Sequence, residues 1–228
     1  MKAERYLWIQ MMPSLVFVSL MWIIWVFAFL LDLHLGVLGL YPRRLSGIWG
    51  IFSSPLIHGS LEHIISNTLA MIILPTLVFL NYPKSAVPLS IWLWLGSGFW
   101  TWCFAREAYH IGASGLVYGY ASFVFFAGIF QKDRRQMALS FLIIFLYSGL
   151  LFGLIPDTGH ISWESHLSGA IAGTGFAYFS RGWDTTLYEN LELNPEDSEE
   201  SNTEKEISLN HIYYTKPGAK HSERIKPS

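Results

Sequence analysis

Long apolar segments alternate with short polar connections along most of this chain. A helix that crosses a bilayer needs roughly 20 mostly apolar residues. Six segments qualify within boundary error: Pro13–Leu33, Leu61–Leu80, Ala86–Ala105, Ser114–Phe130, Met137–Leu154 and Glu164–Ser180. The fourth and sixth are short and carry small or polar residues, which is tolerated where a helix is buried among neighbours. The pattern predicts an all-α, polytopic membrane protein with a bundle of six transmembrane helices.

Two different segments flank this predicted membrane domain of residues 13–181. Residues 1–12 form a short N-terminus, and the apolar stretch after them is too long for a cleaved signal peptide, so we expect it to be retained. Residues 182–228 form a polar, acidic tail with five basic and ten acidic residues. Such a composition cannot bury enough apolar surface to fold alone, and it predicts disorder.

Composition and charge support a membrane protein and suggest its orientation. Only 14% of the residues are charged, compared with about 25% in soluble domains. Basic residues favour the cytoplasmic side of a membrane. With a cytoplasmic N-terminus, that side holds Lys2, Arg5, Lys84, Lys132, Arg134, Arg135 and Arg181, and the far side holds only Arg43, Arg44 and Arg106. We therefore expect both termini in the cytoplasm, in a bacterial inner membrane. The net charge carries no information about nucleic acid, and no nucleic-acid partner is expected.

The first external connection, residues 34–58, is unusually apolar. One interpretation is that it dips into the outer leaflet of the bilayer. The other is that it forms a partly buried connector, and the sequence does not separate the two. The single cysteine, Cys103, lies in an apolar run and is interpreted as a packing residue.

Polar side chains gather near the start of the second, fourth and sixth predicted spans. The second carries His63 and Asn67, the fourth begins at Ser114, and the sixth contains His166. Ionisable groups within a membrane are costly and are functional candidates. Since these three spans run in one direction, their first turns share one depth. Each residue alone has a structural explanation, such as a hydrogen bond between helices, but their occurrence at one depth favours a site.

The chemistry of these residues predicts a serine hydrolase. A serine hydroxyl needs a base to take its proton, and His166 is the candidate because imidazole titrates near neutral pH. His63, Asn67 and the backbone N–H of Ser114 are candidate oxyanion donors. Glu164 lies on the wrong face to orient His166, so we expect a dyad rather than a triad. Tyr118, one turn after Ser114, is placed to pack against the imidazole.

Glycines add a packing signal, and the histidines give no metal signal. Gly115 and Gly119 have the spacing that lets helices approach closely, and Gly169 and Gly173 lie on the face of His166. The sequence contains no HExxH motif, which places both histidines on one helix face, whereas His58 and His63 are five apart. We therefore expect no metal site.

Three motifs together resemble the rhomboid family of intramembrane serine proteases, over residues from about 10 to 181. His58, His63 and Asn67 look like its His-x4-His-x3-Asn segment. Gly112, Ser114 and Gly115 look like its Gly-x-Ser-Gly motif, with Tyr118 at the matching aromatic position. Ser165, His166, Gly169 and Gly173 look like its small-His-x2-Gly-x3-Gly segment.

The resemblance implies a role for each matched residue. Ser114 would be the nucleophile, His166 the base, and His63, Asn67 and the Ser114 amide the oxyanion hole. His58 would be a structural residue near the roof of the site. The substrates would be single-pass membrane proteins, and the resemblance implies no cofactor.

One departure and two alternatives stand beside this interpretation. Many family members carry a Trp-Arg pair in the first external loop, whereas here Gly50 follows Trp49, which leaves the anchoring of that loop open. The main alternative function is a catalytically inactive relative that binds or escorts membrane proteins. A transporter is the weaker alternative, because the polar residues lie away from the middle of the spans.

Overall fold

The computed structural model describes residues 2–156 and 162–184. Within these ranges the regular structure is helical, apart from one isolated β-bridge. Of the acidic tail that was predicted to be disordered, residues 185–228 lie outside the described residues.

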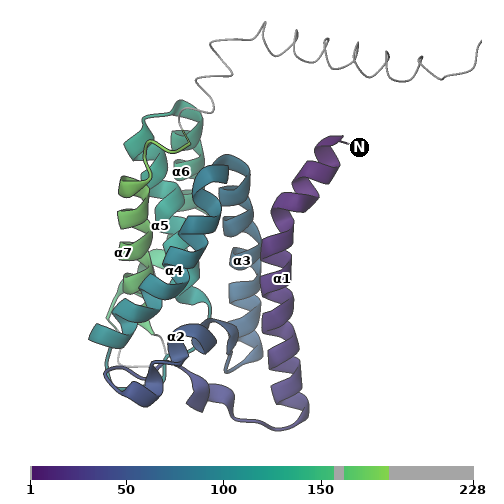
Figure 1. The fold of residues 1–228 in the computed structure, drawn as a ribbon, viewed down its shortest axis with the longest axis vertical. Coiled ribbons are helices and arrows are strands. Elements are labelled where there is room, and N and C mark those ends of the chain that lie inside the picture. Colours follow the sequence, from purple (N-terminus) through teal and green to yellow (C-terminus); the bar gives the residue numbers. More distant parts are fainter. Residues whose placement is uncertain (1, 157–161, 185–228) are drawn as a thin grey trace, which may run out of the picture. The chain divides into compact units, whose positions relative to one another are not determined.

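Six long helices coincide with the six predicted segments (Figure 1). They are α1 (Lys2–Leu30), α3 (Leu61–Asn81), α4 (Pro83–Phe104), α5 (Ser114–Gln131), α6 (Arg134–Leu146) and α7 (Trp163–Phe179). The first begins well before the expected Pro13, which lies inside it. Proline removes one helical hydrogen bond and crowds the preceding turn. Figure 1 shows the N-terminal turns of α1 leaning away from the rest of the helix.

The predicted fifth span is not one straight helix. α6 ends at Leu146, and a 3-10 helix, η4 (Ser148–Leu154), follows it. The stretches Gln136–Ile143 and Ser148–Leu154 meet at an angle of 63°. The prediction of one continuous span over residues 137–154 was therefore wrong in its geometry.

By length and composition, three helices in the described part of the chain suit a membrane crossing. They are α1, α3 and α5, and the bent pair of α6 and η4 would make a fourth. α4 contains Lys84, serines and glycines, and α7 has only 17 residues. The protein is thus an all-helical integral membrane protein, and the crossing of the bilayer by all six helices stays a prediction.

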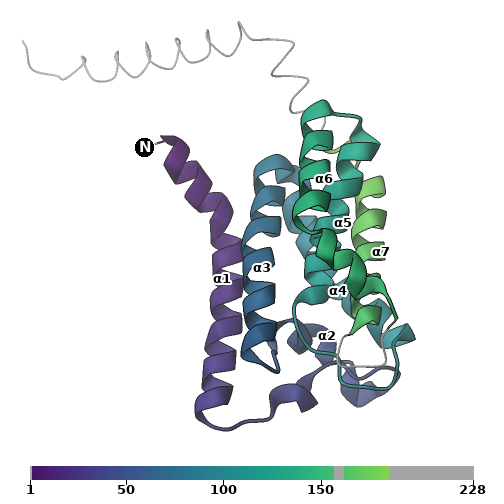
Figure 2. The same ribbon diagram turned by 180° about the vertical axis from the view of Figure 1, so that it is seen from behind.

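α5 lies at the centre of the bundle. It packs against α3, α6 and α7, whereas α1 packs against α3, and α4 packs against α7 (Figures 1 and 2). The core between these helices contains fully buried apolar side chains from five of them, including Met21, Ile64, Leu93, Phe123 and Ala177. Most of the exposed large apolar side chains lie on the outer faces of the helices, as expected for contact with lipid.

Glycines bring α5 and α7 into close contact. A β-carbon at Gly169 would overlap the carbonyl oxygen of Gly115, and one at Gly173 would overlap that of Gly119. The two helices can approach this closely only because no side chain stands at these positions.

The first connection folds into four short helices: η1 (Leu35–Leu38), η2 (Leu45–Gly47), α2 (Gly50–Ser53) and η3 (Ser54–Leu56). Its Leu40 and Ile51 are buried against the bundle, whereas the side chains of Leu45 and Trp49 are 80% and 73% exposed. The segment is therefore a partly buried connector that also presents a large apolar surface.

Arg43 anchors this connection in the absence of a Trp-Arg pair. Its guanidinium donates to the carbonyl of Ala105 at 2.6 Å, and its backbone N–H donates to the carbonyl of Trp102. The indole of Trp102 donates in return to the carbonyl of Arg44 at 3.0 Å. Gly50 is required where it stands, because a β-carbon there would overlap the backbone of Leu40.

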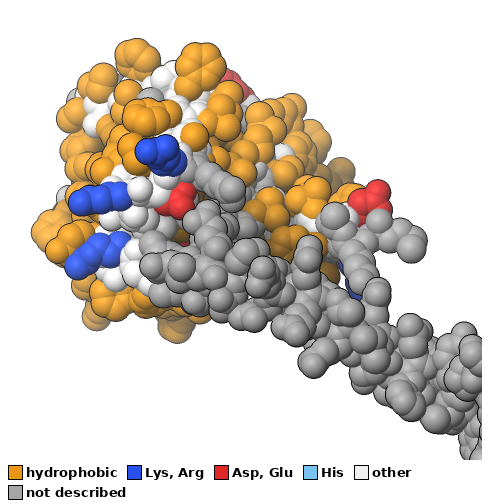
Figure 3. Space-filling model, turned by 90° about the horizontal axis from the view of Figure 1, so that it is seen from above, with side chains coloured by type: hydrophobic (Ala, Val, Ile, Leu, Met, Phe, Trp, Pro, Cys, Tyr) orange, Lys and Arg blue, Asp and Glu red, His pale blue; other side chains and the backbone are white. Residues whose placement is uncertain are grey.

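The opposite end of the bundle carries most of the basic residues in the described part of the chain. Figure 3 looks onto this end, where Lys and Arg side chains lie among apolar ones. Lys84, Lys132, Arg134 and Arg181 are exposed there. The packed unit also continues past Arg181, because the fully buried Asp184 binds the start of α4.

Candidate active site

The polar residues singled out above meet at one end of the bundle. α3, α5 and α7 run in the same direction, and their first turns lie next to the first connection (Figures 1 and 2). Ser60 begins α3 as an N-cap, accepting a hydrogen bond from the backbone N–H of His63 at 3.1 Å. The common direction of these helices gives their polar residues a common depth.

Ser114 and His166 are in direct contact. The Nε2 atom of His166 lies 2.8 Å from the Oγ atom of Ser114, although the two residues are 52 positions apart. His166 is buried and Ser114 is half-buried. Each stands in the first turn of its helix, which the close packing of α5 and α7 brings together.

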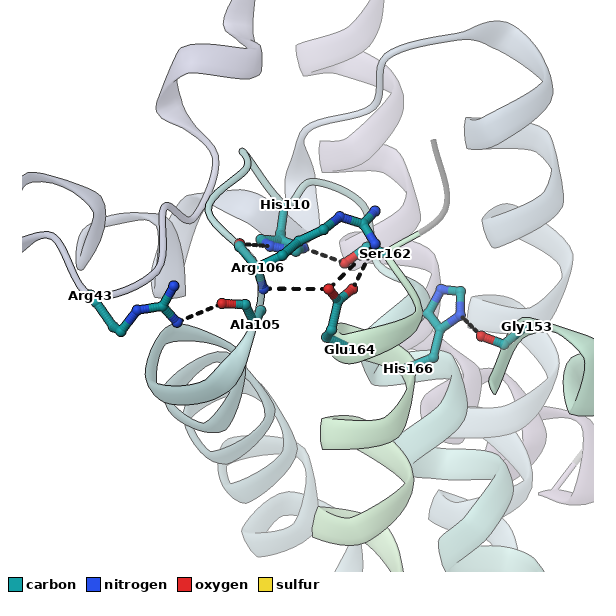
Figure 4. Close-up of polar contacts among 8 residues, drawn as sticks. All are labelled: Arg43, Ala105, Arg106, His110, Gly153, Ser162, Glu164 and His166. Carbon is teal, nitrogen blue, oxygen red and sulfur yellow. Dashed lines mark hydrogen bonds and ion pairs between the residues drawn. The ribbon is translucent and has the colours of Figure 1, made fainter. Parts of the chain in front are cut away.

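A backbone carbonyl orients the imidazole. The Nδ1 atom of His166 lies 2.8 Å from the carbonyl oxygen of Gly153 in η4 (Figure 4). A carbonyl oxygen can only accept, so Nδ1 carries the proton and Nε2 of the neutral ring presents its lone pair to Ser114. The sequence offers no signal for this partner, because it is a main-chain atom.

Tyr118 holds the imidazole from its flat side. The two rings stack with centroids 4.2 Å apart and an angle of 9° between their planes. The Tyr118 hydroxyl donates to the carbonyl of Leu150 at 2.6 Å. Tyr118 and η4 together therefore restrict rotation of the His166 ring.

Gly112 turns the chain into α5 and leaves room for a histidine. Its φ angle of 104° lies in a region that other residues rarely adopt. A β-carbon at this position would also overlap the ring of His63. The ring of His63 therefore contacts the backbone two residues before Ser114.

His58 binds the same turn from the other side. Its Nε2 atom accepts a hydrogen bond from the backbone N–H of Ala113 at 3.4 Å, and its ring packs edge-on against that of His63. Burial, with a smaller contribution from His63, lowers the pKa of His58 to about 4. His58 is therefore neutral near pH 7 and keeps its acceptor atom.

Asn67 is buried on α3, but its amide is directed toward its own helix. The Nδ2 atom donates to the carbonyl of His63 at 2.9 Å. This bond uses one of its two N–H groups. The structure thus brings Ser114, His166 and Tyr118 together. The ring of His63 lies against Gly112, whereas the amide of Asn67 is bonded to its own helix.

Glu164, excluded above as an orienting carboxylate, binds elsewhere. It pairs with Arg106, which follows α4, and points toward it in Figure 4. His110, four residues before Ser114, bonds to Ser162. Neither pairing was predicted, because no motif or helix spacing in the sequence links the two partners.

Two cavities border the site. A small polar one of about 20 Å³ lies behind Gly112 and Gly115 and is also lined by Ser165, and a single water needs about 10–15 Å³. An apolar cavity of about 580 Å³ lies between α5, α6, η4 and α7 and reaches Tyr118. Within the described residues, no three His, Cys, Asp or Glu side chains are grouped to hold a metal ion.

The protein is thus a helical membrane protein in which a serine and a histidine from two different helices are in contact. Residues 45–182 match the family model of the Rhomboid domain. The chain therefore belongs to the rhomboid family, a family of intramembrane proteases.

The chain is also similar to mycobacterial proteins that are described as uncharacterised. One from Mycobacterium bovis and one from Mycobacterium tuberculosis are 32% identical to it over 173 residues, which is 72% of this chain and 72% of each relative. One from Mycobacterium leprae is 31% identical over 140 residues, covering 58% of this chain and 55% of that protein.

Proposed function

We propose that this protein is an intramembrane serine endopeptidase with a catalytic dyad of Ser114 and His166. The observation that carries the proposal is the 2.8 Å contact between Ser114 Oγ and His166 Nε2, in a ring whose other nitrogen is already bonded. A nucleophile within hydrogen-bond reach of a base, with the base oriented by a third group, is the arrangement that activates serine. Membership of the rhomboid family supports the same reaction.

In the first half of the reaction, Nε2 of His166 takes the proton as Ser114 Oγ attacks the peptide carbonyl. The resulting imidazolium keeps its Nδ1–H bond to Gly153, whose carbonyl dipole stabilises the positive charge. The same Nε2 proton then passes to the leaving amine, and an acyl-enzyme remains on Ser114. In the second half, His166 deprotonates a water that hydrolyses this ester.

The oxyanion formed in both halves needs preplaced donors. The backbone N–H of Ser114 lies at the start of α5, where it has no acceptor within the helix. The second N–H of Asn67 and the ring of His63 are the side-chain donors in the proposal. Each such donor typically contributes about 3 kcal/mol to stabilising the transition state.

The substrates in this proposal are single-pass membrane proteins, cut near the outer face of the bilayer. Support comes from the position of Ser114 in the first turn of α5, close to one end of the bundle. The exposed basic residues at the opposite end support cytoplasmic termini in a bacterial inner membrane. In this orientation all six long helices cross the bilayer, with α7 tolerating its small and polar residues because its neighbours bury them.

The test is active-site labelling of the protein in detergent with a fluorophosphonate, together with cleavage of a model single-pass substrate. Ser114→Ala is expected to abolish both. Ser122→Ala, two turns further along the same helix, is the matched control: it removes a hydrogen bond to Ala170 on α7 but no group of the dyad, so labelling and cleavage are expected to persist. Labelling and cleavage that survive Ser114→Ala would overturn the mechanism, and a wild-type protein that does neither favours the inactive relative.

The oxyanion donors have a matched pair of their own. Asn67 Nδ2 and Ser66 Oγ both donate to the carbonyl of His63, but Ser66 is exposed. Asn67→Ala is expected to lower kcat by about a hundredfold or more, and Ser66→Ala to leave it unchanged. Equal rates for the two variants would remove Asn67 from the oxyanion hole.

A further inference from the structure

The loop between α4 and α5, residues 105–113, contacts the start of α7 at two places (Figure 4). The first contact joins Arg106 and Glu164. The backbone N–H of Arg106 and its guanidinium both donate to Oε1 of Glu164 at 3.3 Å, and the guanidinium lies 3.3 Å from Oε2. One carboxylate thus binds both the main chain and the side chain of Arg106.

Burial makes this ion pair different from an exposed one. The Glu164 side chain is 10% exposed and that of Arg106 is 34% exposed. A buried carboxylate is costly unless it is paired and hydrogen-bonded. Glu164 also lies in the first turn of α7, where the helix dipole favours a negative charge. The start of α7 is therefore joined to the loop by an ion pair that is largely shielded from water.

The second contact joins His110 and Ser162. The Nδ1 atom of His110 lies 2.5 Å from the Oγ atom of Ser162, and the carbonyl of Ser162 accepts the backbone N–H of His166 at 3.2 Å. His110 is itself 3% exposed and is fixed by a two-bond bridge to Leu40. A continuous series of hydrogen bonds therefore runs from the first connection to the backbone of His166.

The same loop ends at Ser114, where α5 begins. The loop is therefore connected to both members of the Ser–His pair. It is covalently joined to Ser114, and it contacts the helix turn of His166 through Glu164 and Ser162. We propose that Arg106 and Glu164, together with the bond between His110 and Ser162, form a clamp that sets the orientation of His166 relative to Ser114. Glu164 is in this view a positioning residue; the inference rests on the proposed protease function.

The clamp is not needed to keep α7 in the bundle. The glycine contacts with α5 and the buried Ala172, Phe176 and Ala177 hold that helix along its length. Loss of the clamp should therefore leave the protein folded but allow the first turn of α7 to tilt. A misplacement of about 1 Å at reacting groups can cost roughly a hundredfold in rate.

The experiment compares Glu164→Ala and Glu164→Gln with wild type. Glu164→Ala is expected to lower kcat and the fluorophosphonate labelling rate by about tenfold to a hundredfold, with KM within about twofold. Because it removes one partner of a largely buried ion pair, it should also lower the thermal midpoint, while the protein stays folded at the assay temperature. Glu164→Gln keeps an oxygen acceptor for Arg106 and is expected to recover most, but not all, of the rate. A purely structural role would instead lower the folded fraction and leave kcat of the folded protein unchanged.

Glu107→Ala is the matched control, because Glu107 lies next to Arg106 but forms only an exposed ion pair with Arg43, at 3.7 Å. It is expected to match wild type. Wild-type kcat in Glu164→Ala, or an equal loss in Glu107→Ala, overturns the clamp alone. Should Glu164→Ala not fold, Arg106→Ala decides, because it removes the other side chain of the same ion pair; a kcat equal to wild type overturns the clamp. A wild-type protein that neither labels nor cleaves overturns the proposed function and the clamp with it.

Discussion

The imidazole of His166 donates from Nδ1 to the carbonyl oxygen of Gly153, 2.8 Å away. In a triad this bond goes to a carboxylate, which fixes the tautomer and stabilises the imidazolium. A carbonyl oxygen fixes the tautomer equally well, because it can only accept, but it carries a partial charge. The consequence is that the orientation of the base depends on the position of η4, the short helix that follows the bend after α6.

Gly153→Ala is expected to reduce kcat by about tenfold or more. The added methyl group would overlap the Tyr118 hydroxyl and lie 3.0 Å from Nδ1 of His166, which forces η4 or the two rings to move. Gly149→Ala, in the same short helix, is the control, because nothing lies within 4 Å of its β-carbon. The labelling rate of both variants checks this, and equal rates would show that η4 does not position the base.

The contact between α5 and α7 gives a second glycine pair. Gly173→Ala places a methyl group on the carbonyl of Gly119, and overpacking of this kind typically costs about 1–3 kcal/mol. Gly175→Ala, on the same helix, meets nothing within 4 Å and should stabilise the helix by up to about 1 kcal/mol. Unfolding by a denaturing detergent should separate the two variants in opposite directions. A Gly173→Ala protein as stable as wild type would contradict the close contact.

Much of the site follows from the sequence because membrane helices alternate in direction. Once the spans are counted, the first turns of α3, α5 and α7 must share one end of the bundle, which brings Ser114 near His166. The spacing of Gly169 and Gly173 after His166 also indicated the face that packs on α5. These features depend on the helical spacing of the glycines and on the positions of apolar and polar residues, both of which can be read directly from the sequence.

Other features depend on main-chain atoms or on pairings between distant segments. The carbonyl group of Gly153 is a main-chain atom that every residue carries, so the residue type does not indicate its role. The bend before η4 contains no proline that would predict it. Arg43 replaces the expected Trp-Arg anchor by adopting a φ angle of 55°, which its residue type does not favour. Glu164 could be excluded from orienting His166, but its actual partner could not be identified.

The buried histidines near the site predict a loss of stability in acid. Burial lowers the pKa of His110, which Arg106 and Glu164 face, and it lowers that of His58 to about 4. In the unfolded chain a histidine takes up its proton near pH 6.5, whereas in the folded protein His58 and His110 are protonated only at lower pH. The free energy of unfolding should therefore be constant above about pH 6.5 and should fall as the pH drops toward 4, by at most about 1.4 kcal/mol per pH unit for each histidine.

Detergent-induced unfolding measured between pH 4 and pH 8 checks this dependence. His58→Gln retains an oxygen that can accept the N–H of Ala113 but does not titrate. It is expected to reduce the slope between pH 6.5 and pH 4 while leaving stability at pH 8 nearly unchanged. A slope identical to wild type would mean that His58 is protonated equally in both states.

Asp184 caps α4 from beyond the end of α7. Its Oδ1 atom accepts the backbone N–H of Lys84 at 2.9 Å, and its Oδ2 atom accepts the Ser85 hydroxyl at 2.5 Å. Because the residue is fully buried, Asp184→Ala leaves these donors without water as a substitute and should cost about 1–2 kcal/mol. Asp184→Asn keeps one acceptor and should cost less.

Asp133→Ala removes a half-buried contact to the N–H of Gln136 and serves as the comparison. Unfolding of the three variants should rank Asp184→Ala as the least stable, and a cost no larger than that of Asp133→Ala would contradict the buried cap.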